Sequence, residues 1–148
     1  MTTPPIQNIA VIGLGTIGHS VAQVYAAAGC TVRCFDPDPT TGASLADRVR
    51  TNLKQMASAG LSSPDEIEHV VSRFVICDSE VEAVSGAEFV SEAAAEDLPI
   101  KQALFARLEN HIDRYTILAS NTSTYPMTQI SRDMVHPDRA LVPNPFNP

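Results

Sequence analysis

The sequence predicts an α/β fold in which helices cover both faces of an open, mostly parallel, doubly wound sheet. Short apolar runs rich in β-branched residues alternate along the chain with longer segments of helical periodicity, which is the element order of such a sheet. The first apolar run is stopped abruptly by glycines, as a buried parallel strand would be. The 148 residues match the size of one domain, and no internal repeat interrupts the alternation.

In the first half of the chain, two strands and two helices are expected to alternate. Residues 6–12 and 31–35 predict the strands, because both runs are short and apolar. Gly29 suits a left-handed cap at the end of the first helix, and the Asp-Pro-Asp-Pro run at 36–39 predicts the turn before the second. Apolar residues at helical spacing mark the two helices, namely Val21, Val24, Tyr25 and Ala28, and then Leu45, Val49, Leu53 and Met56.

The second half continues the alternation. Ser63, Pro64 and Glu66 supply the N-cap, the first-turn proline and the capping-box partner of a short helix that extends to residue 71. The apolar spacing within residues 98–112 predicts a further helix. Strands are expected at residues 73–77, 87–91 and 116–120, with a short strand-like start at 140–142.

Composition excludes several classes of function. Ten Lys and Arg against seventeen Asp and Glu give a net charge of −7, which is the wrong sign for binding nucleic acid through its phosphates. The three cysteines show no CxxC spacing, so neither disulfides nor a metal site is expected, and a reducing, cytoplasmic location is favoured. Glycines break the apolar stretch 9–30 and no basic residue precedes it, so a membrane span is not expected.

Residues 13–18, Gly-Leu-Gly-Thr-Ile-Gly, match the GxGxxG pattern where a strand is expected to end and a helix to begin. Gly13 can form the tight turn, Gly15 lets a pyrophosphate approach the backbone, and Gly18 permits close packing of the helix. Unpaired N–H groups and the positive end of the helix dipole then attract phosphate. The sequence therefore predicts a Rossmann dinucleotide-binding unit whose cofactor-binding residues include Gly13, Gly15, Thr16, Ile17 and Gly18.

Asp36 follows Gly18 by eighteen residues, at the end of the second expected strand. A carboxylate there can accept hydrogen bonds from both hydroxyls of an adenosine ribose and repels a 2′-phosphate, so NAD is favoured over NADP. Asp36 can also simply start the Asp-Pro turn, and the two roles are compatible. Arg33 is a possible partner for a 2′-phosphate, but its place inside the strand makes this the weaker alternative.

Further motifs stand in order along the chain. They are residues 11–18 with Ala22-Gln23-Val24, Ser91-Glu92-Ala93 with Glu96-Asp97-Leu98 and Lys101, the Ala-Ser-Asn-Thr-Ser-Thr run at 119–124, and Phe146-Asn147-Pro148. With these motifs, the chain resembles the NAD-binding domain of the L-3-hydroxyacyl-CoA dehydrogenase family along essentially its full length. The Ser-Asn-Thr-Ser run is the most specific of them.

The resemblance implies NAD as the cofactor and assigns roles to four residues. Glu96 and Lys101 would contact the nicotinamide half, while Asn121 and Ser123 would lie beside the nicotinamide and the substrate hydroxyl. Each follows the carboxyl end of an expected strand, the edge where open α/β sheets bind ligands. The alternatives are an exposed acid at a helix start for Glu96, a solvated lysine for Lys101 and a helix N-cap for Ser123.

One departure from the family concerns catalysis. The family histidine that accepts the hydroxyl proton precedes the Phe-Asn-Pro run, and alignment without gaps from Ser123 places Asn144 at that position. The catalytic positions are therefore Ser123 and Asn144, but an amide can orient a hydroxyl and cannot accept its proton as imidazole does. His136 is a minor alternative as the base. Pro145 makes the run Pro-Phe-Asn-Pro, which is similar to relatives that act on carnitine or sugar acids.

The resemblance implies an NAD-dependent oxidoreductase that oxidises a 3-hydroxyacyl thioester to the 3-keto form, as in fatty acid metabolism. The alternatives are a dehydrogenase of a small hydroxy acid, and an NAD-binding protein without turnover. A homodimer is expected for the full-length form, with an acyl-CoA or a small hydroxy acid as substrate. Residues 1–148 are expected to form one Rossmann domain, truncated before a second, helical domain, so this chain alone is expected to be inactive.

Overall fold

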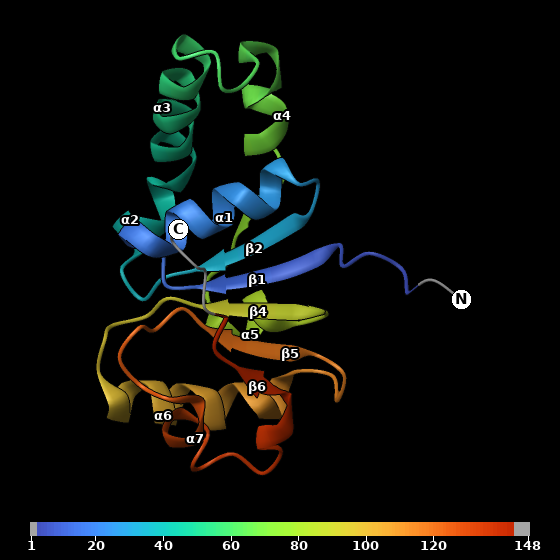
Figure 1. Cartoon of the computed structure of the whole chain (residues 1–148), viewed down its shortest axis with the longest axis vertical. Coiled ribbons are helices and arrows are strands. Elements are labelled where there is room, and N and C mark those ends of the chain that lie inside the picture. The colour runs from blue at the N-terminus through green and yellow to red at the C-terminus, as the bar shows by residue number, and fades with distance from the viewer. Residues whose placement is uncertain (1–2, 144–148) are drawn as a thin grey trace.

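The computed structural model describes residues 3–143, which form one six-stranded sheet flanked by helices (Figure 1). The strands are β1 (Asn8–Ile12), β2 (Thr31–Phe35), β3 (Phe74–Ile76), β4 (Phe89–Glu92), β5 (Ile117–Ser120) and β6 (Ala140–Leu141). Their order is β3-β2-β1-β4-β5-β6, and every pairing is parallel. The order reverses between β1 and β4, as in the two halves of a Rossmann fold, which confirms the predicted fold class.

The helices connect successive strands. They are α1 (Thr16–Ala27), α2 (Pro39–Ala43), α3 (Leu45–Ser58), α4 (Ile67–Val71), α5 (Glu80–Val84), α6 (Leu98–Leu108) and α7 (Met127–Ile130), with 3₁₀ turns at Pro64–Glu66, Glu109–His111 and Pro137–Arg139. The long helices confirm the periodicity-based expectations. The sequence analysis missed α2, α5 and α7, because helices of one or two turns are too short to show an apolar period.

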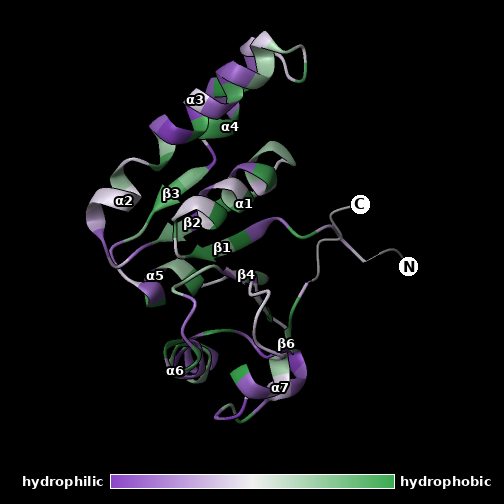
Figure 2. Cartoon of the chain, turned by 60° about the vertical axis from the view of Figure 1, so that its left-hand side comes forward, coloured by the Kyte–Doolittle hydropathy of each residue, from purple (hydrophilic) through white to green (hydrophobic). Residues whose placement is uncertain are grey.

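Strand β1 separates two apolar cores, because alternate side chains of a strand point to opposite faces of the sheet. Ile9 and Val11 pack with α1, α3 and α4, whereas Ala10 and Ile12 pack with α5 and α6. Figure 2 shows β1 as largely hydrophobic, while α3 carries hydrophilic and hydrophobic residues in turn. The central strand is therefore covered on both faces, as the near-continuous apolar run predicts.

The buried face of α1 differs from the one that its large apolar residues indicated. Gly18, Ala22 and Ala26 are buried, whereas Val24 is 63% exposed and Ala28, just after the helix, is also exposed. Small side chains on this face let the helix approach β1 and β2 closely. In α3 the expected packing residues Leu45, Val49 and Leu53 are all buried.

The long apolar stretch near the N-terminus is divided between a strand and a helix. Residues 9–30 contain most of β1 and the whole of α1, with the turn at residues 13–15 between them. Among the helices described for residues 3–143, none is long and apolar enough to cross a bilayer.

Candidate functional site

The turn between β1 and α1 combines tight packing with an open space. At Gly13, φ is +91°, and an added Cβ would stand 2.5 Å from the carbonyl oxygen of Ala93. An added Cβ at Gly18 would stand 1.8 Å from the carbonyl oxygen of Gly13, so both positions require glycine. A Cβ at Gly15 would meet nothing within 4 Å. The first and third glycines therefore shape the turn, while the second leaves room beside it.

The start of α1 is arranged to receive an anion. Gly15 is the N-cap residue, and no side chain caps the helix. The N–H groups of the first turn therefore keep their capacity to bind a negatively charged group, which the helix dipole also attracts. Thr16 and Ile17 are exposed, and Ile17 keeps 57% of its surface accessible. The open space beside Gly15 thus fits a pyrophosphate, which would occupy the volume that a side chain would fill.

Asp36 joins the end of β2 to the glycine turn. One of its carboxylate oxygens accepts the N–H of Leu14 at 2.8 Å, and the other accepts the N–H of Asp38 at 2.9 Å. The structural role in the turn is therefore confirmed, and it leaves lone pairs for further donors, since a carboxylate has about four acceptor sites. Arg33 instead donates to the carbonyl oxygen of Glu82 at 2.8 Å and 3.2 Å. These bonds direct its guanidinium toward α5.

A cavity of about 530 Å³ adjoins the glycine turn and Asp36. Its walls are mostly apolar, which suits a flat aromatic ring. Glu80 and Arg107 form an ion pair within the lining. The other lining residues are Ile12, Gly13, Gly15, Phe35, Asp36, Pro37, Ala93, Ala94, Ala95, Ile100 and Leu104.

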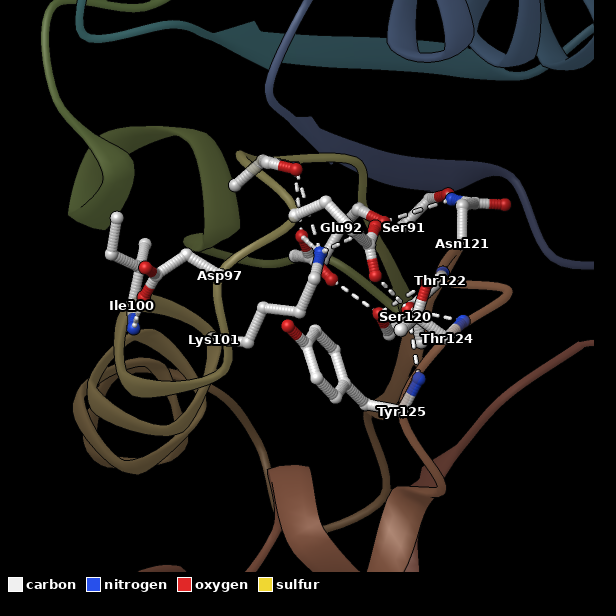
Figure 3. A network of polar contacts seen from close by, with 12 residues as sticks. Ser91, Glu92, Asp97, Ile100, Lys101, Ser120, Asn121, Thr122, Thr124 and Tyr125 are labelled. Atoms are coloured by element: carbon white, nitrogen blue, oxygen red, sulfur yellow. Dashed lines mark hydrogen bonds and ion pairs between the residues drawn. The ribbon is translucent and has the colours of Figure 1, made fainter.

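At the ends of β4 and β5 the structure buries an ion pair (Figure 3). Glu92, the last residue of β4, accepts from Lys101 Nζ at 2.7 Å, and each of these two residues is 0% exposed. Glu92 also accepts from the N–H of Ala94 at 2.7 Å and from the hydroxyl of Ser120. In all three of these hydrogen bonds the carboxylate is the acceptor. The alternative that Lys101 is a solvated lysine is wrong, because it belongs to the buried face of α6.

Glu96 connects this pair to the loop after β5. Its Oε2 lies 3.8 Å from Lys101 Nζ, and its Oε1 accepts from the hydroxyl of Thr122. Thr122 Oγ1 in turn accepts the N–H groups of Thr124 at 3.1 Å and Tyr125 at 3.3 Å. The side chain of Glu96 is 46% exposed, so it combines these contacts with access to solvent.

The loop after β5 holds the remaining predicted site residues. Asn121 donates from Nδ2 to Ser91 Oγ at 2.7 Å and to the carbonyl oxygen of Glu92 at 3.0 Å, which fixes its amide against β4. Ser123 is exposed, and the alternative of an N-cap is wrong, since α7 starts at Met127. Asn144 lies outside the described residues.

The sequence analysis assigned no role to Glu92, although a signal for it exists. Glu92 directly follows the strand expected at residues 87–91, and a carboxylate that is buried at the end of a parallel strand needs a cationic partner. The chain contains only two lysines, Lys54 and Lys101, and the second follows Glu92 by nine residues. His136, the minor alternative for a base, is exposed. Within residues 3–143, no three His, Cys, Asp or Glu side chains are grouped to hold a metal ion.

The reversed strand order, the glycine turn and the acid at the end of β2 define a dinucleotide-binding Rossmann domain. A model of the family described as 3-hydroxyacyl-CoA dehydrogenase, NAD binding domain, matches residues 8–148. The chain therefore belongs to the 3-hydroxyacyl-CoA dehydrogenase family and corresponds to the NAD-binding domain of that family.

The chain is similar to several dehydrogenases over part of their length. It is 34% identical over 149 residues to L-carnitine dehydrogenase of Streptomyces coelicolor, covering 100% of this chain and 46% of that protein. It is 34% identical over 143 residues to the probable 3-hydroxybutyryl-CoA dehydrogenase of Bacillus subtilis, covering 97% of this chain and 50% of that protein. The crystal structure of 3-hydroxybutyryl-CoA dehydrogenase from Escherichia coli K12 matches with a TM-score of 0.89 and 31% identity, over 98% of this chain and 30% of that one. The chain spans half or less of the length of each.

Proposed function

We propose that this chain is the cofactor-binding part of an NAD-dependent dehydrogenase that oxidises the 3-hydroxyl of an acyl thioester to a ketone. The observation that carries the proposal is the pairing of two sites across the switch point of the sheet. The first site is the open space at Gly15, and the second is formed by the linked side chains of Glu92, Lys101 and Glu96. Ligands of open α/β sheets bind across this point. NAD, when bound, accepts the two electrons of the oxidation.

Two sets of residues would hold the cofactor. The adenosine and pyrophosphate side would be held by backbone groups and one carboxylate, at Gly13, Gly15, Thr16, Ile17, Gly18 and Asp36. The nicotinamide side would be held by polar side chains at the ends of β4 and β5, namely Glu96, Lys101, Asn121 and Ser123. The exposure of Ser123 supports a further role, since an accessible hydroxyl can orient the hydroxyl of a substrate.

Proton removal is the step for which this chain offers the weakest group. Asn144 occupies the position of the family histidine in the ungapped alignment, and an amide can orient a hydroxyl but does not accept its proton near neutral pH. This favours a second candidate function, an NAD-binding protein without turnover. Oxidation of a small hydroxy acid is supported by the similarity to L-carnitine dehydrogenase and by the Pro-Phe-Asn-Pro run.

Calorimetric titration with NAD and NADP tests the cofactor assignment. We expect NAD to bind more tightly, because the charge of Asp36 repels a 2′-phosphate. Asp36→Asn should narrow the preference for NAD over NADP by about five- to 150-fold, as expected for roughly 1 to 3 kcal/mol from a charged group. Asp38→Asn is the matched control, since Asp38 caps α2 and should not affect the preference. Equal or tighter binding of NADP to the parent chain would overturn the assignment.

The substrate class is tested by following NADH absorbance with the full-length gene product. Turnover of acetoacetyl-CoA with NADH supports the leading proposal, whereas turnover of carnitine alone supports the small hydroxy-acid alternative. If NAD binds and neither substrate reacts, the binding protein without turnover is favoured. A homodimer of the full-length form and a cytoplasmic location belong to the same proposal, and size-exclusion chromatography and cell fractionation test them.

A further inference from the structure

We propose that Glu92 sets the relative affinity of this site for the oxidised and reduced cofactor. It would do so by neutralising Lys101, so that Glu96 supplies the net charge of the nicotinamide side. Glu92 would be a positioning residue, since it acts through Lys101 and contacts neither cofactor nor substrate in this scheme. The inference rests on the proposed function, because it requires NAD to bind across the two halves of the sheet.

The first step is that Glu92 and Lys101 cancel each other's charge. Their side chains are 0% and 1% exposed and lie 2.7 Å apart, so water screens neither charge. The ammonium of Lys101, the N–H of Ala94 and the hydroxyl of Ser120 all donate to the Glu92 carboxylate, and these hydrogen bonds favour its charged form. The pair thus contributes almost no net charge to its surroundings.

The second step is that Glu96 keeps a negative charge beside the pair. Lys101 Nζ lies 3.8 Å from Glu96, farther than the 2.7 Å to Glu92, so the ammonium is already engaged. Within residues 3–143, Glu96 also accepts from the hydroxyl of Thr122, which is neutral. Glu92, Lys101 and Glu96 together therefore carry one net negative charge, located on the half-exposed carboxylate of Glu96.

The third step is the position of this charge relative to the cofactor. The first half of the sheet, with Gly15 and Asp36, suits the adenosine part, so the second half, with β4 and β5, receives the nicotinamide part. The oxidised ring carries a positive charge that the reduced ring lacks, and the rest of the molecule is the same. A net negative charge near the ring therefore favours the oxidised form, and loss of Glu92 removes that preference.

This reasoning separates an electrostatic role for Glu92 from a merely structural one. A local distortion of the site would weaken the binding of both forms together. A change of one unit of charge instead alters the ratio of the two dissociation constants, since only the ring charge differs between the forms. The ratio of Kd for oxidised NAD to Kd for reduced NAD is accordingly the decisive readout.

The experiment compares the parent chain with Glu92→Gln, titrating each with oxidised and reduced NAD. The amide oxygen of glutamine can still accept from Lys101 and Ala94, and its NH2 group can donate to the Ser120 hydroxyl. Lys101 keeps Glu96 at 3.8 Å and the carbonyl oxygen of Ala94 at 3.4 Å, so its ammonium is retained. We expect the ratio to rise about three- to tenfold, the size expected for one charge acting through a partly hydrated site. An unchanged ratio overturns the inference.

Three further variants complete the test. Glu96→Gln leaves the buried pair intact and should raise the ratio by a similar factor, so it decides the question even if Glu92→Gln does not fold. The double variant Glu92→Gln/Lys101→Met restores one net negative charge and should return the ratio to the parent value. Glu80→Gln is the matched control, because the Glu80–Arg107 pair lies in the lining of the cavity beside Gly15 and Asp36, and its loss should change both dissociation constants in proportion.

The outcomes distinguish this inference from the proposed function. If neither form of NAD binds the parent chain, the proposed function fails. If both forms bind but Glu96→Gln does not move the ratio, or the double variant keeps the ratio of Glu92→Gln, only the assignment of charges fails.

Discussion

At the β1–β2 end of the sheet the site is built from backbone, whereas at the β4–β5 end it is built from side chains. The first end has glycines that leave no space at Gly13 and Gly18 but leave space at Gly15. The second end has a buried carboxylate and ammonium tied to two loops. Substitutions that add atoms should therefore disrupt the β1–β2 end, whereas substitutions that remove a charged side chain should disrupt the β4–β5 end.

The two ends of the sheet also differ in how they bury titratable groups. Burial raises the pKa of the Cys34 thiol in β2 to about 12, so this group stays neutral. Glu92 and Lys101 are as deeply buried but lie together as a pair. A single buried titratable group favours its neutral form. A buried ion pair keeps both groups charged only as long as both partners are present.

The largest expected effect is the loss of one partner of the buried pair. Lys101→Met should lower the free energy of unfolding by about 3 to 5 kcal/mol, because it leaves the Glu92 charge buried without its cation. Urea denaturation measures the change. The matched control is Lys54→Met, since Lys54 is exposed on α3 and its loss should cost no more than about 0.5 kcal/mol. A loss below about 1 kcal/mol for Lys101→Met would mean that the pair is not the anchor of this end.

Adding one methyl group to the glycine turn should have the next largest effect. Gly18→Ala should cost about 1 to 3 kcal/mol of stability, because the new Cβ would overlap the carbonyl oxygen of Gly13. Gly15→Ala is the counterpart, with φ at −67° and free space around the Cβ, so the fold should tolerate it. Its NAD affinity should nevertheless fall, by about tenfold for roughly 1.4 kcal/mol. Unchanged NAD binding by Gly15→Ala would contradict a pyrophosphate at this turn.

The thiol of Cys34 offers a third test, with an effect on reaction rate. Because its pKa is about 12, the folded chain holds few thiolates at pH 9, and iodoacetamide should modify Cys34 about 700-fold more slowly than in urea. The raised pKa also means that folding favours the protonated thiol, so its contribution to stability is lost as pH rises above the unfolded value of about 8.5. Mass spectrometry of the alkylated peptide follows the reaction. Equal rates in folded and unfolded chains would show that β2 opens readily.

The smallest effect is expected at Glu88, which directly precedes β4 and therefore lies at the amino-terminal end of that strand. The N–H groups of Gln7 and Asn8 lower the pKa of this exposed carboxyl. Its stabilising contribution is therefore present above the unfolded pKa of about 4.3 and is lost as pH falls through the lower folded value. Glu88→Gln should be slightly less stable than the parent at pH 7, and the two melting temperatures should converge in acid. A gap that widens on acidification would contradict the assigned contacts.

Local features of the chain allowed part of the fold and site to be predicted. The alternation of strands and helices, the turn at Gly13 and the acid at Asp36 follow from apolar periodicity and from the steric freedom of glycine, which belong to short stretches of sequence. The family motifs identified Glu96 and Lys101 as site residues, and the structure brings them to 3.8 Å from each other. Their roles toward the cofactor stay predictions.

Tertiary structure decided what these residues contact. Lys101 and Glu92 are nine residues apart, and Ser120 is 28 residues from Glu92, yet all three meet because α6 packs against the sheet where β4 and β5 end. A sequence pattern specifies neither which lysine is buried nor which helix face approaches closely enough to require small residues such as Ala22. Burial and charge pairing depend on contacts between distant segments, so only the folded chain turns a strand-end glutamate into the partner of a buried lysine.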